Sequence, residues 1–189
     1  SIETATVGAG SVGLELSDIE VAMVLVSDTK GNNTGATPVL TDDVSYTAIR
    51  AEVGDGETVG STGQMVSVTD FALEINQSKN NDGTAGATVL DFDDGNDPNL
   101  LALEVATGPS TTATIDLDGG EGQLLQVAGA ISLDVFGFVT LDGSFAFKKA
   151  TGDFTLADAT TLEDVPYLAI GASIETATVG AGSVGLELS

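Results

Sequence analysis

The chain contains no cysteine, no histidine and no tryptophan, and each absence removes a class of chemistry. Without cysteine there are no disulfides and no thiol nucleophiles, and without cysteine and histidine the usual zinc sites cannot form. The lack of histidine also removes the commonest general base and every Ser-His-Asp arrangement. Paired carboxylates of the glycosidase kind remain, but no tryptophan is present to form a sugar platform. We therefore predict that the chain is not an enzyme.

Basic residues are scarce, because five of them face 29 acidic residues, for a formal net charge of −24. The five are Lys30, Arg50, Lys79, Lys148 and Lys149. Binding to nucleic acid requires basic groups that neutralise the phosphates, so this balance excludes nucleic acid as a partner. Copies of such a chain repel one another at close range. We expect divalent cations or salt to screen that repulsion.

Long hydrophobic runs are absent too. The longest, Val21 to Val26, is far shorter than the ~20 residues of a membrane-spanning helix, so we predict no membrane span. Hydrophobic residues nevertheless make up 42% of the chain, which favours a folded protein. For a secreted domain of this size, the lack of disulfides points towards bacterial surface proteins, and an extracellular or cell-surface location is the expectation.

A long exact repeat is the strongest positive signal. Ser173 to Ser189 repeats Ser1 to Ser17 letter for letter, 172 residues further along the chain. The repeat indicates a tandem array in which residues 1–172 form one period and residues 173–189 begin the next. An alternative is that a duplicated strand lets separate subunits polymerise by strand exchange. Three diverged subrepeats are predicted within the period: residues 167–189 with 1–45, residues 46–99, and residues 100–166.

Alternation of apolar and polar residues with period two predicts strands along most of the chain. In two related stretches the apolar phase shifts by one residue, at Ser17-Asp18 and at Thr69-Asp70. One extra residue in a strand predicts a β-bulge or a sharp corner. We expect Asp18 and Asp70 to hold these corners by bonding to nearby backbone amides.

Asp-Gly pairs predict turns, because glycine adopts backbone angles that other residues resist. They occur at Asp55-Gly56, Asp82-Gly83, Asp94-Gly95, Asp118-Gly119 and Asp142-Gly143. The predicted fold class is therefore all-β. Its favoured architecture is an elongated β-solenoid or β-helix-like rod of stacked repeats, and a β-sandwich repeat domain is the alternative.

Two acidic clusters are candidate calcium sites, because Ca²⁺ takes six to eight oxygen ligands. The first cluster contributes Asp91, Asp93, Asp94, Asn96 and Asp97, although Ala102 stands where an EF-hand needs its bidentate Glu.

The second cluster comprises Asp116, Asp118 and Glu121 around a glycine turn. It resembles the calcium-binding nonapeptide repeats of secreted bacterial proteins only in Gly119 to Gly122, because Leu124 replaces the aspartate of that motif. Solvated acidic loops and turn chemistry are the alternative interpretations of the two clusters.

A longer resemblance involves Leu133 to Phe138 (LDVFGF) followed by Gly143 to Phe147 (GSFAF). This pair resembles a recurring segment in the tandem repeats of giant acidic bacterial cell-surface and adhesin-like proteins, which are often associated with calcium-binding repeats. The resemblance implies a surface location and a structural or adhesive role, and it supplies no catalytic residues.

The sequence therefore predicts a structural repeat of an extracellular bacterial fibre, surface coat or giant adhesin, with neighbouring copies of itself as the partner. Calcium is the expected cofactor. The alternatives are an adhesin-type module that binds a glycan or surface ligand, and a subunit of a strand-exchange polymer. A spacer should have interchangeable loops, and no loop here is rich in aromatic residues.

Overall fold

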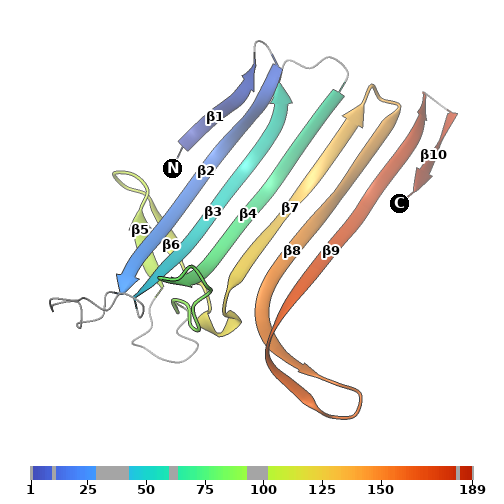
Figure 1. The fold of residues 1–189 in the computed structure, drawn as a ribbon. Helices are drawn as coiled ribbons and strands as arrows, with labels where there is room; N and C mark the ends of the chain where they lie inside the picture. The colour runs from blue at the N-terminus through green and yellow to red at the C-terminus, as the bar shows by residue number, and fades with distance from the viewer. Residues whose placement is uncertain are drawn as a thin grey trace.

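The computed structural model describes residues 2–9, 12–28, 43–59, 64–92, 102–181 and 184–188. They form one antiparallel sheet in the order β1-β2-β3-β4-β7-β8-β9-β10, and β5 pairs with β6 in a second, two-stranded sheet (Figure 1). The all-β prediction is confirmed. The strands are β1 (Ile2–Ala9), β2 (Val12–Asp28), β3 (Val44–Val59), β4 (Gln64–Asn80), β5 (Leu103–Ala106), β6 (Thr112–Ile115), β7 (Leu124–Val135), β8 (Val139–Thr155), β9 (Thr161–Ala181) and β10 (Val184–Leu188), and one 3-10 turn, η2, spans Gly119–Glu121.

Alternation gives the large sheet two unlike faces. Ala51, Leu73 and Val127 lie side by side across β3, β4 and β7. One residue away on each strand, Arg50, Glu74 and Gln126 lie side by side in the same way. Because successive side chains point to opposite faces, the first row belongs to an apolar face and the second to a polar face.

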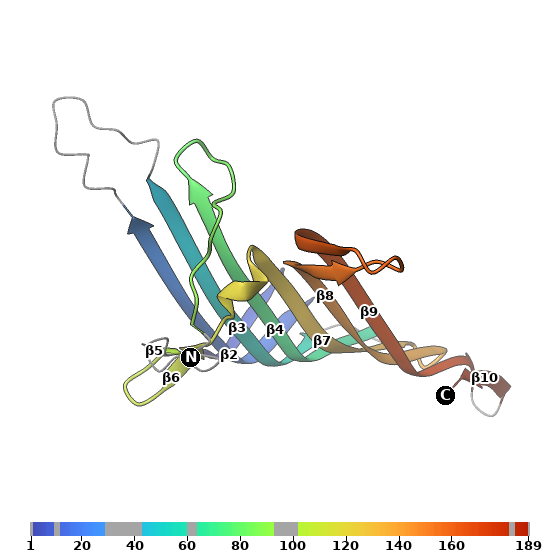
Figure 2. The same cartoon turned by 90° about the horizontal axis from the view of Figure 1, so that it is seen from below.

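The core lies on the polar face, where β5, β6 and the segment after them pack against the large sheet. Figure 2 shows the small sheet on one side of the large one. Asn76, on the same face, is fully buried and its amide donates to the Leu90 carbonyl at 2.6 Å. The core is small because it covers only part of one face. Its buried apolar residues are Ala22, Ala48, Ala113, Ile115, Leu117, Leu124 and Ala150.

The long strands bend partway along their length (Figure 2). Asp18 and Asp70 adopt left-handed backbone angles, with φ of 53° and 51°. Gly54 of β3 lies between them in register, so β2, β3 and β4 turn together and keep the same register on both sides of the bend. Towards β7 the register shifts between Thr69 and Ala72, which is the expected bulge.

The predicted means of holding the corners is not the one observed. The Asp18 and Asp70 carboxylates make no hydrogen bond to a backbone amide within the described part of the chain. Aspartate tolerates the left-handed region better than most residues, so its backbone conformation is what suits the corner.

Two of the predicted Asp-Gly turns lie inside strands instead. Gly56 is within β3 and Gly143 is within β8, and both need the absence of a side chain because neighbouring strands approach closely. A Cβ on Gly56 would lie 2.7 Å from the Leu16 side chain, and one on Gly143 would lie 2.3 Å from the Ser173 carbonyl oxygen. The turn at Gly83 is confirmed, with φ of 87°. Asp94-Gly95 lies outside the described residues.

The Leu133–Phe138 segment contains the end of β7 and the three-residue turn that connects β7 to β8. Phe136 and Gly137 both have positive φ, at 54° and 66°. The Gly137 amide donates to the Asp134 carboxylate at 2.7 Å, and the Phe138 amide donates to the Val135 carbonyl at 2.9 Å. Residues 136–138 therefore form a hairpin turn.

The large sheet is open, with β1 and β10 as its outer strands. Neither a solenoid coil nor a second large sheet stacked on the first occurs among the residues described above. The stacked rod thus stays a prediction about how copies are arranged. Within the described ranges, no helix is long and apolar enough to cross a membrane.

Candidate functional site: the two edges of the sheet

The repeated segment forms the same hairpin at both edges of the large sheet (Figure 1). At one edge, β1 pairs with the start of β2, with Val7 opposite Leu14 and Thr6 opposite Glu15. At the other edge, the end of β9 pairs with β10, with Val179 opposite Leu186. The two hairpins have the same register. Each of the five residue pairs between β9 and β10 recurs between β1 and β2 when 172 is subtracted from both residue numbers.

The two hairpins are joined to the sheet through different strands: the first through its second strand, and the second through its first strand. At the first edge, β2 continues the sheet by pairing with β3, and β1 is outermost. At the second edge, β9 continues the sheet by pairing with β8, and β10 is outermost. The structure therefore contains a partner for both sides of one hairpin sequence, although each copy has only one of them.

Side chains of the repeated segment make specific contacts where β9 meets β8. The Thr176 hydroxyl donates to one Asp142 oxygen at 2.8 Å, and the Ser132 hydroxyl donates to the other at 2.5 Å. Thr178 shares a hydrogen bond with Thr140. The equivalents of these two threonines in β1, Thr4 and Thr6, are exposed.

Electrostatics at this contact favour a charged Asp142. Hydrogen bonds from Ser132 first, and then from Thr176, lower the pKa of the Asp142 carboxyl below its ordinary value. Hydroxyls that donate to a carboxylate stabilise its ionised form, which is the cause of this shift.

Large apolar side chains are exposed at both edges, beyond the ends of the short hairpins. In β2, Met23 and Leu25 are 53% and 66% exposed. In β9, Leu168 and Ile170 are 58% and 74% exposed. All four lie on the apolar face by strand alternation and register. A sheet that ends in such side chains has edges suited to pairing rather than to solvent.

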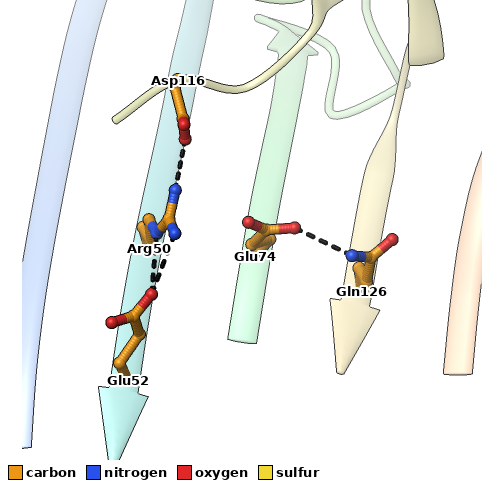
Figure 3. Close-up of polar contacts among 5 residues, drawn as sticks. All are labelled: Arg50, Glu52, Glu74, Asp116 and Gln126. Atoms are coloured by element: carbon orange, nitrogen blue, oxygen red, sulfur yellow. Dashed lines mark hydrogen bonds and ion pairs between the residues drawn. The ribbon is translucent and has the colours of Figure 1, made fainter. Parts of the chain in front are cut away.

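Polar contacts on the polar face join the segment after β6 to β3 and join β4 to β7 (Figure 3). The Arg50 guanidinium on β3 donates to Glu52 Oε1 from Nη2 at 2.9 Å and also pairs with Asp116, just after β6. Burial lowers the pKa of Arg50, but the hydrogen bonds to Glu52 and Asp116 outweigh it and raise that pKa overall. Between β4 and β7, the Gln126 amide donates to Glu74 at 3.0 Å.

The predicted calcium ligands are only partly within the described residues. Four residues of the first cluster lie outside them: Asp93, Asp94, Asn96 and Asp97. In that cluster only Asp91 is described, and its Oδ1 accepts the Gly119 amide at 3.0 Å.

The second cluster is fully described, and its carboxylates face other groups. Asp116 pairs with Arg50, and Glu121 pairs with Lys148 on β8. Asp118 Oδ1 caps η2 by accepting the Gly120 amide at 2.7 Å. No group of three or more acidic residues is placed to hold a metal ion in the described part of the chain.

A cleft of about 600 Å³ lies at the end of the sheet where β4 and β7 separate. Two of the chain's five basic residues, Lys79 and Lys149, line it, together with polar groups such as Ser45 and Gln123. Among the described residues that line it, none carries a carboxylate. This is a small basic region on a strongly acidic protein.

Comparison of the chain with protein-family models, with curated proteins and with solved structures finds no match in any of the three. The geometry of the two edges is therefore the main indication of function. Sequence reasoning found the repeat but missed the matching open edges, although the shared phase of Met23, Leu25, Leu168 and Ile170 was a readable signal.

Proposed function

We propose that the chain is a structural repeat of an extracellular bacterial fibre, surface coat or giant adhesin, and acts as a rod or spacer. The single observation that supports this most strongly is the recurrence of one hairpin, in one register, at opposite edges of the sheet. A unit that ends as it begins can be followed by another identical unit. The LDVFGF resemblance supports an extracellular bacterial setting.

The arrangement of strands suits an elongated array. Between the two hairpins the chain runs through β2, β3, β4, β7, β8 and β9, an even number of antiparallel strands. The second hairpin therefore runs in the same direction as the first. Repeats related in this way follow one another along the hydrogen-bonding direction, which is also the axis of the solenoid-like rod predicted from the sequence.

The proposed role includes cations that neutralise the acidic surface. Without the duplicated acids Glu175 and Glu187, one period has 27 acidic and five basic residues, which gives a net charge of −22. Calcium bound by acidic loops would reduce the repulsion between neighbouring units, and such a chain would fold after export into a calcium-rich medium.

The array is tested with chains of one, two and three periods, measured by small-angle X-ray scattering and electron microscopy with and without a calcium chelator. A rod predicts that the longest dimension rises by a constant increment per period. A radius of gyration that grows as in a compact globule would contradict the proposal.

The cleft lined by Lys79 and Lys149 favours a second candidate, a module that binds an acidic glycan. Its test is calorimetric titration with a uronic acid oligosaccharide, with a neutral oligosaccharide of the same length as the control. Lysine–carboxylate attraction predicts binding of the acidic ligand that weakens with added salt and with Lys149→Ala. Equal heats for the two sugars would contradict this candidate.

A further inference from the structure

We infer that a second copy of the 172-residue unit continues the sheet in one defined register, with β9 of one copy paired along its length with β2 of the next. This inference rests on the proposed function and adds to it the partner strand and the register. It also distinguishes one unbroken sheet from a string of separate domains.

The first step combines two pairings that the structure already contains. β9 lies beside β8 with Thr178 opposite Thr140, and β2 lies beside β3 with Leu14 opposite Thr58. Because the end of β9 has the sequence of β1, and β10 has that of the start of β2, a single hairpin can make both pairings at once. The strand order is then β8, β9, β10 and the β3 of the next copy, with every neighbour antiparallel.

The second step extends the register beyond the hairpin. Ile2 lies opposite Ile19, so Ile174, its counterpart in β9, falls opposite Ile19 of the next copy. Antiparallel pairing then places Ile170 opposite Met23 and Leu168 opposite Leu25.

The third step is that these positions match in chemistry. Ile170, Leu168, Met23 and Leu25 are each more than half exposed in the single unit, and in the continued sheet they become cross-strand neighbours on the apolar face. A shift of one residue would place Ile170 opposite Val24, which points to the other face. The hairpin pairs therefore set the register, and the exposed apolar side chains of the two edges lie on the face that this register requires.

The bend also continues across this junction. Glu175 is the extra residue where the register between β8 and β9 shifts, and its counterpart Glu3 stands opposite Asp18 at the other edge. The corner at Asp18 of the next copy thus falls in line with the irregularity at Glu175. Each copy adds six strands, or about 29 Å along the hydrogen-bonding direction.

The test uses residues 1–189 followed directly by a second copy of residues 18–189, so that the hairpin occurs once at the junction. Ile170→Cys in the first copy is combined with Met23→Cys in the second, in a chain that has no other cysteine. Mild oxidation and peptide mass spectrometry measure the disulfide. We expect strong cross-linking, because the Cα atoms of directly opposite residues in an antiparallel sheet lie within the range that a disulfide spans.

Two controls accompany this variant, the first in the tandem chain and the second in the single chain. Ile170→Cys with Val24→Cys is one residue out of register and on opposite faces, so it should remain at least tenfold less cross-linked. Ile170→Cys with Met23→Cys in the single 189-residue chain places the cysteines at opposite edges, where no internal disulfide should form. Equal cross-linking in the two tandem variants, or none in either, would overturn the inference.

A second measurement needs no substitution. Amides of residues 165–172 that exchange at edge-strand rates in the single chain should be protected at the junction of the tandem chain. Unchanged exchange would also overturn the inference. If the tandem chain is elongated but its junction is neither protected nor cross-linked, the array proposal stands and the unbroken sheet fails.

Discussion

Asp18 of β2 lies across from Gly54 of β3, and a Cβ on Gly54 would come within 2.9 Å of the Asp18 Cβ. The left-handed backbone of Asp18 directs its side chain over the neighbouring strand, and only glycine leaves room for it. On the far side of Gly54, Asp70 repeats the left-handed conformation. The bend therefore depends on a row of three residues on three strands.

Gly54→Ala should destabilise the protein by about 1–3 kcal/mol, because the added methyl group forces Asp18 or its strand to move. Urea unfolding measures the difference. Gly171→Ala is the matched control, because it is also in a strand and its Cβ would meet nothing within 4 Å. That change should alter the free energy of unfolding by no more than about 0.5 kcal/mol. Equal losses in the two variants would contradict the close contact at the bend.

Gln123, just before β7, bonds through its side chain to the end of β4 and to Gly86. Gln123→Ala should lower the free energy of unfolding by about 1–3 kcal/mol. Its side-chain amide donates to the Gly86 carbonyl at 2.9 Å and to the Ser78 hydroxyl at 3.0 Å, and its oxygen accepts the Ser78 amide at 3.2 Å. Ser78 is buried, so removing the amide leaves buried polar groups without partners. Urea unfolding again gives the free energy, and the exposed neighbour Gln77→Ala should be near neutral. A neutral Gln123→Ala would show that water replaces these bonds.

Thr176→Val should raise the pKa of the Asp142 carboxyl towards its ordinary value, because it removes one of the two hydroxyl donors. In the parent protein the folded-state pKa is the lower one, so the stabilisation is present above the unfolded pKa and is lost as pH falls through the folded pKa. The stability difference between parent and variant should thus be largest near neutral pH and shrink below about pH 4. Carboxyl NMR titration and unfolding at several pH values measure both effects.

Thr178→Val is the control for that titration, since Thr178 contacts Thr140 rather than a carboxylate. It should leave the Asp142 pKa and the pH dependence of stability as they are in the parent. A difference between Thr176→Val and the parent that is the same at pH 7 and pH 3 would contradict the role of the hydrogen bond to Asp142.

Calcium removal should lower the melting temperature if cations offset the acidic surface. Melting is compared in calcium chloride, in chelator, and in chelator with sodium chloride added to equal ionic strength. If sodium chloride restores the melting temperature, then screening of the acidic charges by salt is sufficient for stability. Identical curves in all three conditions would contradict any role for cations in stability.

The sequence predicted the strands and the corners because both depend on local pattern. Alternation identified β2 and β4, and the phase shift identified Asp18 and Asp70. It misassigned Gly56 and Gly143 to turns, because the close approach of Leu16 and Ser173 that requires glycine comes from strands distant in sequence.

At the candidate site, too, features set by nearby residues could be predicted from the sequence, and features set by distant residues could not. The repeat was visible in the sequence, whereas the complementary open edges depend on the order of eight strands. The acidic clusters were predicted from composition alone. The partners of Asp116 and Glu121, which are Arg50 and Lys148, lie far from them in sequence and were not predicted.

The strand order has a mechanical consequence for an array of these units. Tension applied along the array acts across the strands, so the backbone hydrogen bonds between neighbouring strands carry the load in series. The chain has no disulfide to act as a stop. Fifteen residue pairs join β2 to β3, but only five join β9 to β10 in the single unit. An end hairpin without its neighbour is thus the first place where strands should separate, and the proposed pairing with the next copy would reinforce it.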